Sequence, residues 1–486
     1  MKAHHTFRPI AVAPLQTRGS PWLHQQRMNL SNGKANTNSA RSVEIPMEAA
    51  QHTTPTPALP PHSLLPTKAL LRSSLVAAVS SHPFLLNPSL SILTFLSGQT
   101  SRLLSLEKNP ILYALFKKTM YNHFCAGENG KEVGATIKGL KDMGYSGVIL
   151  TYAREVVMDH STQEGSGVGA QLIKDGTADV PAQTQDIFDA DIEAWREGVF
   201  ETAGLIGEND FLALKFTGAG AVVADALQAD KPFPKQMMAA LEEVCEKAIS
   251  QKASILVDAE QQFVQKAIDR VAIDLMKKYN RDGKTVVYNT YQAYLKATPD
   301  VLYKHMKQAA DEGFAIGVKL VRGAYINSEP RHLINDSKEG TDDQYNSIAS
   351  ALLNGQYRDM GEDQPLPLPK FQLFMGTHNK ESVLKANELQ RKRAEQGLCV
   401  RPVRYGQLLG MADEVSCTLL LLKAQTQGAP MFVSPEAYKC LSWGTLGDCV
   451  SYLMRRAKEN KDAVSRTKQE YIALRREVWR RFIKYL

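Results

Sequence analysis

The sequence predicts an α/β protein with a closed (β/α)8 TIM-like barrel, preceded by an N-terminal helical arm and a disordered leader. Eight short β-rich runs alternate with helical stretches after about residue 121, which is typical of a parallel sheet built from βαβ units. Most of the runs are almost continuously apolar, as expected for strands that are buried on both faces. Polar and charged residues follow several runs, at the strand ends where barrels carry their sites.

Each of the eight runs is short enough for one strand and is followed by a stretch with helical periodicity. The runs are Gly147–Ala153, Phe211–Phe216, Ser254–Ala259, Thr285–Tyr291, Phe314–Val321, Phe371–Thr377, Val400–Tyr405 and Pro430–Val433. Eight such units most simply close into a barrel. The pattern also fits an open, doubly wound sheet.

The first part of the chain differs in composition from the rest. We expect residues 1–45 to be a mitochondrial transit peptide or disordered segment, 46–120 a linker and N-terminal helices, and 121–486 the barrel. No acid occurs before Glu44, whereas six cations do: Lys2, Arg8, Arg18, Arg27, Lys34 and Arg41. A basic, acid-free leader that contains serine resembles a transit peptide, and a plain disordered tail is the alternative. The Pro-rich stretch from Met47 to Pro66 is expected to be extended and unpacked.

Composition excludes several function classes. The formal net charge of +7 lies largely in the leader, so no basic stripe on the folded part indicates nucleic-acid binding. The six cysteines form no C-x-x-C pair, and neither a metal site nor a disulfide framework is expected. The apolar stretch from Leu70 to Leu96 is interrupted by Arg72, Pro83 and Pro88. It falls short of the roughly 18–20 apolar residues of a membrane span and predicts packed helices.

A long polar insertion, Asp159 to Ala194, follows the first predicted strand. It contains the glycine-rich run Gly165–Gly169 (GSGVG), which resembles part of a dinucleotide fingerprint. No helix start follows in register and no acid follows at the required distance, so we interpret the insertion as a flexible loop.

Polar residues at several strand ends are candidates for a common site. They are Lys215 and Thr217, Asp258 and Glu260, Lys319 and Arg322, and Thr377, His378 and Asn379, with Arg455, Arg456 and Glu459 on a late helix. Taken singly, such a lysine is usually solvated and an Arg pair with Glu at i+4 is usually a salt-bridged helix face. Their convergence on one barrel mouth favours a site.

The same residues resemble the proline dehydrogenase family. The resemblance rests on Lys319–Glu329 (KLVRGAYINSE), preceded by Gln292–Lys296 and followed by Gly376–Asn379. The order and approximate spacing of further motifs also match: Leu214–Phe216, Leu256–Glu260 (LVDAE), Gln407–Met411 (QLLGM) and Tyr452–Asn460 (YLMRRAKEN). The similarity extends from about Tyr121 to Asn460 and is closest to the eukaryotic members.

The resemblance implies FAD bound at the carboxyl ends of the strands. The residues that match the family's flavin contacts are Asp258, Gln292, Lys319, Arg322, Gly323, Ala324, Thr377, His378 and Asn379. The residues that match its substrate-binding set are Lys215, Tyr325, Leu408, Cys440, Arg455, Arg456, Glu155 and Glu459. Among them Lys215, Asp258, Tyr325, Arg455 and Arg456 are expected to act in catalysis.

The implied reaction is the oxidation of L-proline to pyrroline-5-carboxylate, by hydride transfer from C5 to the flavin. Paired Arg donors suit the substrate carboxylate, and the protein supplies orientation and exclusion of water. By resemblance, the electrons pass to ubiquinone at the matrix side of the mitochondrial inner membrane.

One position departs from the family pattern. The family reads Y-x-P-x-G fifteen residues before the first Arg of the pair, whereas this chain reads Cys440-Leu-Ser442-Trp-Gly444. The aromatic wall of the substrate pocket is therefore a cysteine, unless Tyr438 takes its place. A wider pocket would admit 4-hydroxyproline, and a neighbour that fills the gap would keep proline as the substrate.

Two other functions remain open from the sequence. A barrel lyase could use Lys215 as a Schiff-base amine without a flavin, or the barrel could have lost its activity. The basic C-terminal stretch from Arg466 to Leu486 is interleaved with apolar residues, including Trp479. It predicts a helix that either contacts a membrane surface or packs on the barrel.

Overall fold

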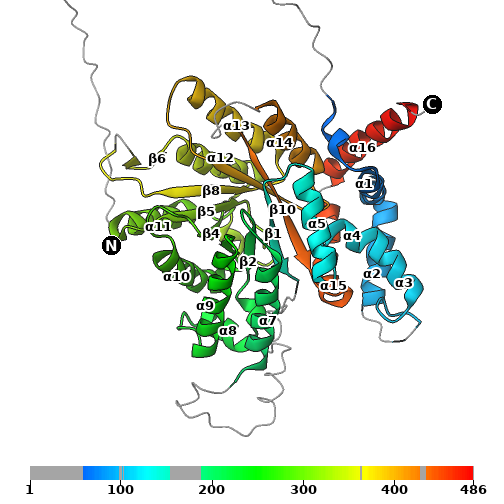
Figure 1. Ribbon diagram of the computed structural model, residues 1–486, viewed down its shortest axis with the longest axis horizontal. Coiled ribbons are helices and arrows are strands. Elements are labelled where there is room, and N and C mark those ends of the chain that lie inside the picture. Colours follow the sequence, from blue (N-terminus) through cyan, green and yellow to red (C-terminus); the bar gives the residue numbers. More distant parts are fainter. Residues whose placement is uncertain are drawn as a thin grey trace, which may run out of the picture. The chain divides into compact units, whose positions relative to one another are not determined.

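A closed barrel of eight parallel strands forms the centre of the protein, as predicted (Figure 1). The computed structural model describes residues 59–97, 101, 103–153, 188–361, 364–426, 434–462 and 464–484. The predicted transit peptide lies outside these residues. Around the barrel the strand order is β1-β10-β9-β8-β5-β4-β3-β2, so the chain runs round the barrel strand after strand and the open-sheet alternative is wrong.

Seven barrel strands overlap the predicted runs, and the eighth is a correction. The strands are β1 Gly147–Tyr152, β2 Phe211–Leu214, β3 Ser254–Val257, β4 Val287–Gln292, β5 Ile316–Val321, β8 Phe371–Gly376, β9 Val403–Leu408 and β10 Glu436–Trp443. The run at Pro430–Val433 lies outside the described residues, and the strand that closes the barrel comes after it. A small hairpin, β6 Gln356–Tyr357 with β7 Met360–Gly361, lies between α12 and β8.

Helices surround the barrel and form the N-terminal arm (Figure 1). The arm holds η1 Pro61–Leu64, α1 Thr67–Ser80, α2 Pro83–Ser97, α3 Pro110–Phe116, η2 Lys117–Tyr121 and α4 Asn122–Phe124. The remaining helices are α5 Gly130–Asp142, α7 Ala190–Leu205, η3 Thr217–Ala219, α8 Ala221–Gln228, α9 Lys235–Ser250, α10 Gln262–Tyr279, α11 Thr298–Glu312, η4 Arg331–Leu333, α12 Lys338–Leu353, α13 Lys380–Glu395, α14 Asp413–Gln425, α15 Leu446–Asp462 and α16 Val464–Lys484.

Aromatic side chains fill the interior of the barrel. The ring centroid of Phe211 lies 5.3 Å from those of Phe374 and Tyr438 and 5.5 Å from that of Tyr288, all in edge-on contact. A Cβ at position 406 would lie 2.5 Å from the Phe374 ring, so only glycine leaves room for this ring. The interior is therefore a packed core, and a ligand must bind at the ends of the strands.

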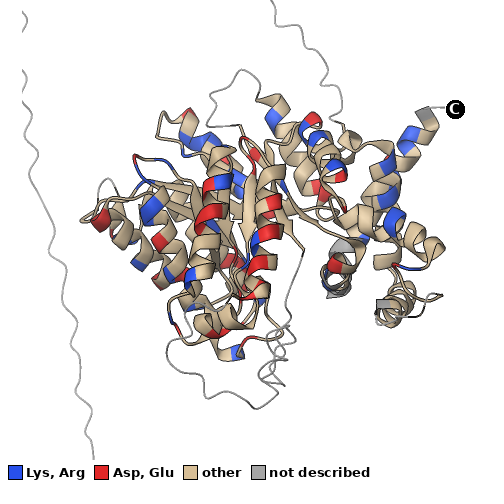
Figure 2. Ribbon diagram, turned by 60° about the horizontal axis from the view of Figure 1, so that its bottom comes forward, with Lys and Arg blue, Asp and Glu red and all other residues tan. Residues whose placement is uncertain are grey.

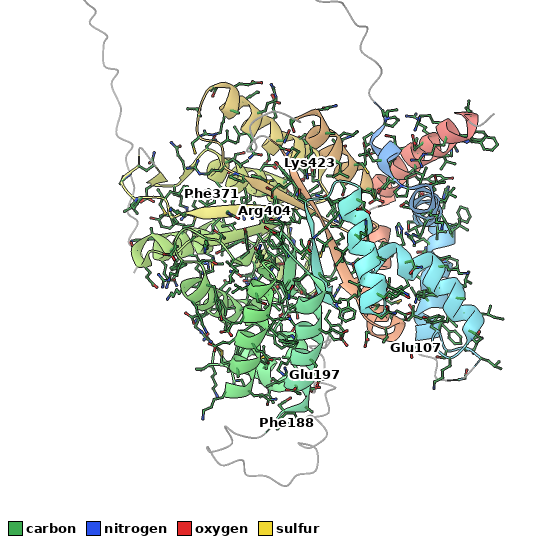
Figure 3. All side chains as sticks on the ribbon, viewed as in Figure 1. Glu107, Phe188, Glu197, Phe371, Arg404 and Lys423 are labelled. Carbon is green, nitrogen blue, oxygen red and sulfur yellow. The ribbon has the colours of Figure 1, made fainter. Side chains whose placement is uncertain are left out.

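The amino-terminal end of the barrel is closed by polar contacts to Arg404 (labelled in Figure 3). Its guanidinium donates to Glu436 at 3.0 Å, to the Tyr288 hydroxyl at 2.5 Å and to Gln372. The carboxylate of Glu436 balances the charge of the partly buried Arg404, which lies beside the aromatic layer. The polar side chains at this end of the barrel therefore bond to one another, and a functional site is expected at the carboxyl end.

The end of the predicted linker is packed, contrary to the expectation of an extended segment from Met47 to Pro66. Residues from Pro61 to Leu64 form η1, and both His62 and Leu65 are buried. Arg481 of α16 donates to the carbonyl oxygens of His62 and Leu65 at 3.3 and 2.8 Å. The C-terminal helix therefore holds the start of the arm in place.

Helix α16 packs against α1, with Leu474 buried between them (Figure 1). Its far side exposes Trp479, Phe482 and Ile483, and Lys and Arg residues are spread along it (Figure 2). Helices α1, α2 and α3 also expose large apolar side chains: Leu71, Leu75, Phe84, Ile92, Phe95, Ile111 and Leu115. No single described helix is long and apolar enough to cross a membrane, although α1 and α2 pass that test as a pair bent by 99°.

A buried ion pair joins β10 to α14. Lys439 points outward from its strand, and its Nζ atom lies 2.9 Å from Asp413 Oδ1 at the start of α14. The same ammonium group donates to the carbonyl oxygen of Met411, and Ser73 of α1 donates to Asp413 Oδ2 at 3.1 Å. Burial would raise the pKa of Asp413, but the charge of Lys439 outweighs this and holds it below its usual value.

Candidate active site

Side chains at the carboxyl ends of the barrel strands form the candidate site. The strands are parallel, so these ends share one rim. The predicted residues on this rim are Lys215 after β2, Asp258 after β3, Gln292 at the end of β4, Lys319 and Arg322 within and after β5, Thr377, His378 and Asn379 after β8, Leu408 at the end of β9, and Cys440 within β10. The topology therefore brings residues more than 200 positions apart to one mouth.

Asp258 and Lys319 form an ion pair at this mouth. The Lys319 Nζ atom lies 2.5 Å from Asp258 Oδ1, and the two side chains are 13% and 21% exposed. Both side chains are mostly buried, and the attraction between the two charges offsets the solvation that each has lost. The carboxylate is consequently committed as an acceptor, which makes Asp258 a poor candidate for a free base.

Arg322 is held in one orientation by four side chains. Its guanidinium donates to Asp342 at 2.6 Å, to the Thr377 hydroxyl at 2.8 Å and to the Ser382 hydroxyl at 3.0 Å. It also stacks over the ring of Tyr345, 4.3 Å from the centroid. A side chain that is fixed in this way is ready to receive an anionic or carbonyl group without further ordering.

The backbone after Arg322 is exposed and depends on glycine. Gly323 has a φ of +142°, and a Cβ there would lie 2.2 Å from the ring of Tyr294. Gly323 and Ala324 are both exposed. A flat ligand can therefore approach this backbone closely, which a larger residue at position 323 would prevent.

The other predicted flavin contacts also make contacts within the protein. Gln292 donates through Nε2 to the carbonyl oxygen of Glu260 at 3.1 Å, and the backbone N–H of Leu408 donates to His378 Nε2 at 3.1 Å. Asn379 caps α13 by accepting from the Ser382 N–H at 3.0 Å. These bonds fix the orientations of the three side chains at the rim.

Glu260 organises the loop that carries Lys215, a role that the sequence did not reveal. Its Oε1 atom accepts from the N–H groups of Phe216 at 3.1 Å and Thr217 at 3.2 Å, and the Thr217 hydroxyl donates to Oε2. Burial raises the pKa of Glu260, and the charge of Lys215 opposes this rise. Trp195 of α7 donates to the Lys215 carbonyl oxygen at 3.0 Å, so the loop is held from both sides.

Electrostatic coupling connects the predicted substrate residues. Burial raises the pKa of the Cys440 thiol to about 11, and the charges that act on it are those of Lys319, Asp258, Arg456 and Lys215. Burial also raises the pKa of Tyr325; the charges of Glu260 and Asp258 add to this rise, and those of Lys215 and Arg455 oppose it. Lys215 thus acts on both groups, together with one arginine in each case. Through these two groups the three cations are coupled to the barrel mouth, and their roles stay predictions.

Tyr452 lies beneath the two arginines and was not predicted as a site residue. The guanidinium carbons of Arg455 and Arg456 lie 5.9 and 5.1 Å from its ring centroid, within the range of a cation–π interaction. The ring is buried. The spacing of i to i+3 and i+4 on one helix was the signal that could have revealed this platform.

Tyr438 does not replace the missing aromatic at position 440, so that alternative is wrong. Its ring belongs to the interior layer with Phe211 and Phe374, and its hydroxyl donates to Glu436 at the amino-terminal end of the strand. Cys440 itself packs at the edge of this layer. The side chains of β10 alternate, so Tyr438 lies one layer deeper than the mouth.

Some predictions fall outside the described residues. Glu155 and most of the predicted loop lie in the range 154–187. The predicted end of the loop at Ala194 is wrong, because α7 begins at Ala190 with Asp189 as its N-cap. Glu459 belongs to α15, but its side chain is not among those described. Within the described part of the chain, no group of three metal-ligating side chains comes together.

Comparisons with known proteins agree on one family. The family model "Proline dehydrogenase" matches residues 133–469. A fission-yeast (Schizosaccharomyces pombe) protein named "Probable proline dehydrogenase, mitochondrial" is 28% identical over 450 residues, covering 85% of this chain and 88% of the relative. Rat (Rattus norvegicus) hydroxyproline dehydrogenase is 27% identical over 400 residues, covering 76% and 83% of the two chains.

Solved structures agree with the fold. The crystal structure of proline utilization A (PutA) from Bdellovibrio bacteriovorus, inactivated by N-propargylglycine, superposes with a TM-score of 0.57 at 15% identity. The superposition covers 80% of this chain and 38% of the bacterial chain. At this identity the likeness concerns the barrel fold alone.

Proposed function

This chain belongs to the proline dehydrogenase family, and from that premise we propose that it oxidises L-proline to pyrroline-5-carboxylate with FAD bound at the barrel mouth. The proposal is supported by the charges of Lys215, Arg455 and Arg456, which act on Tyr325 and Cys440 near the carboxyl ends of the strands. A cationic mouth above an apolar, aromatic-filled barrel suits a substrate that has a carboxylate and an apolar ring.

The three cations would bind the proline carboxylate. Arginine offers paired donors in a plane, which match the two carboxylate oxygens. Tyr452 restricts the two guanidinium groups through its ring, and Glu260 restricts the loop of Lys215. Leu408 and Cys440 would then contact the substrate ring, and Tyr325 would close its side as a neutral hydroxyl.

The strand-end donors fit a flavin. The fixed guanidinium of Arg322 and the exposed backbone at Gly323 and Ala324 provide a charged and a flat surface side by side. Gln292, Lys319, Thr377, His378 and Asn379 would complete the binding set on the same rim. FAD, when bound, supplies the acceptor for the hydride from C5 of the substrate.

The protein contributes orientation more than proton transfer. Asp258 is paired with Lys319, and the pKa values of Tyr325 and Cys440 are raised by burial, so all three are unsuited to accept the proton of the substrate amine at neutral pH. We propose that this proton leaves to water before the hydride is lost. The clamp on the carboxylate then holds C5 toward the flavin.

The cellular setting follows from the relatives. Their names place them in the mitochondrion, and we propose the same compartment for this chain, with residues 1–45 as the transit peptide, 46–120 as linker and helices and 121–486 as the FAD-binding barrel. We also propose ubiquinone as the electron acceptor and a peripheral contact with the matrix side of the inner membrane. The exposed apolar side chains of α1, α2, α3 and α16 support that contact.

Product analysis tests the proposed reaction. Purified protein with L-proline and an artificial electron acceptor should form pyrroline-5-carboxylate, which is trapped by o-aminobenzaldehyde as a coloured adduct. A chain that purifies without flavin and forms no adduct from proline, but gives a lysine adduct trapped by borohydride with a carbonyl compound, would favour the Schiff-base alternative instead. No turnover of either proline or hydroxyproline by a flavin-loaded enzyme would indicate an inactive barrel.

Hydroxyproline is a second candidate substrate, because Cys440 replaces the aromatic of the family pattern and Tyr438 does not fill its place. Restoring the aromatic by Cys440→Tyr is expected to lower kcat/KM for hydroxyproline relative to proline by about 30-fold, since the hydroxyl loses its space. Steady-state kinetics with both substrates measure the ratio. The exposed Cys399 gives the control Cys399→Tyr, and an unchanged ratio in Cys440→Tyr would contradict the wider pocket.

A further inference from the structure

A cavity of about 480 Å³ lies away from the barrel interior, between the N-terminal arm and the outer face of the barrel. Residues of helices α1, α4 and α5 line it, together with the loop from β9 to α14. Its volume is in the range of small-molecule sites. Apolar side chains make up part of the lining: Leu65, Leu140, Met143 and Leu409.

The charged side chains around this arm cavity are unequally paired. Three cations line it, Arg72, Lys117 and Lys439, together with the carboxylates Glu132 and Asp413. Lys117 is paired with both Glu128 and Glu132, and the Lys439 Nζ atom lies 2.9 Å from Asp413 Oδ1. The charge of Asp413 also acts on Arg72, but no ion pair joins Arg72 to a carboxylate among the described residues.

Arg72 has an unused donor at this place. Its Nε atom is buried and has no hydrogen-bond partner among the described residues. A buried donor without a partner is unfavourable, and an oxygen atom of a ligand would satisfy it. His123 is buried beside it, and burial lowers its pKa to about 4, so the imidazole adds no second charge.

We propose that the arm cavity binds an apolar molecule that carries a hydrogen-bond-accepting oxygen, with Arg72 donating to that oxygen. Both the carbonyl of a quinone and the carboxylate of a fatty acid have this chemistry. The apolar walls would cover the body of the molecule, and the unused Nε donor of Arg72 would meet its oxygen.

The position of the cavity suits a quinone that accepts the electrons of the reaction. Leu409 and Gly410 line it and directly follow Leu408 at the barrel mouth. Oxidation of proline to pyrroline-5-carboxylate releases two electrons and two protons, which convert a quinone into a quinol. This role rests on the proposed function, whereas binding in the cavity does not.

Two glycines of α5 provide a matched test. Gly139 lines the cavity, Gly134 does not, and a Cβ at either position would meet no atom within 4 Å. Gly139→Phe should therefore fill the cavity without disturbing the fold, and Gly134→Phe is its control. Arg72→Met removes the donor and keeps the length of the side chain.

Equilibrium dialysis of the full chain would measure binding of two probes, a benzoquinone with a short isoprenoid tail and decanoate. We expect one probe to bind saturably, with affinity about tenfold or more weaker in Gly139→Phe and Arg72→Met and unchanged in Gly134→Phe. The probe that binds identifies the source of the oxygen. Absence of saturable binding by both probes, or undiminished binding by Gly139→Phe, would overturn the proposal.

Turnover of proline with an artificial dye separates this proposal from the proposed function. All three variants should retain it, because none of the positions belongs to the barrel mouth. Loss of dye reduction in the unmodified chain would count against the proposed function and leave the binding result as it stands.

Discussion

Arg456→Met should lower kcat/KM for L-proline by about 1000-fold, which corresponds to about 4 kcal/mol. The side chain is 7% exposed and lies over Tyr452, where its charge also acts on Cys440. Methionine keeps much of the apolar bulk and removes the donors to the carboxylate. The substrate would then leave a carboxylate oxygen without a partner in a desolvated site. Steady-state kinetics at saturating acceptor measure the loss.

Arg476→Met is the control for this substitution. Arg476 is exposed on α16, so its replacement removes the same charge far from the barrel mouth and should leave kcat/KM within about a factor of two. The flavin content and the thermal midpoint of both variants should match those of the unmodified chain. A loss of less than about threefold in a folded, flavin-loaded Arg456→Met enzyme would remove Arg456 from the substrate site.

Lys439→Met should lower the free energy of unfolding by about 4 kcal/mol at pH 7. The substitution leaves the carboxylate of Asp413 buried without its cation, and that carboxylate is held at the junction of β10, α14 and α1. Denaturant titration measures the change. Lys138→Met removes one partner of an exposed pair on α5, and it should cost less than about 1 kcal/mol.

The pH dependence of this loss gives a second check. In the unmodified chain the pKa of Asp413 is depressed, so its contribution to stability is present above the unfolded value of about 3.9 and is lost as pH falls through the folded value. In Lys439→Met burial should instead raise this pKa, and protonation would then favour the folded state at low pH. The difference between the two proteins should therefore narrow from pH 7 toward pH 4. A constant difference would contradict the ion-pair explanation.

The alternation of β-rich runs and helical stretches predicted a parallel sheet and favoured a barrel over an open sheet, because eight mostly apolar strands most simply close on themselves. Strand β10 was not predicted from this pattern. It carries Lys439 and Ser442, whereas the run at Pro430–Val433 is apolar throughout. A lysine inside a strand is compatible with burial only when a carboxylate meets it, and Asp413 lies on a different element. The pairing of Lys439 with Asp413 forms only when the chain has folded, so the sequence pattern does not reveal it.

The candidate site, like the fold, could be predicted only in part from the sequence. Polar residues at strand ends were visible in the sequence, since parallel strands must place them on one rim. Their interactions were not, because Asp258 and Lys319 are 61 positions apart and pair only when the barrel closes. Glu260 holds the backbone after Lys215 through main-chain N–H groups, and such groups leave no trace in a pattern of side chains. The i to i+3 and i+4 spacing on one helix could have placed Tyr452 beside the two arginines. The same spacing is also typical of a tyrosine in the core.

We propose that a flavin at the barrel mouth receives the hydride of a proline whose carboxylate is bound by Lys215, Arg455 and Arg456. An anaerobic absorption spectrum of the purified chain, recorded before and after addition of L-proline, tests it directly. We expect flavin bands in the resting protein and their bleaching by L-proline, with the bleaching lost in Arg456→Met at the same proline concentration. A folded protein without flavin bands, or a bound flavin that neither L-proline nor hydroxyproline bleaches, would contradict the claim.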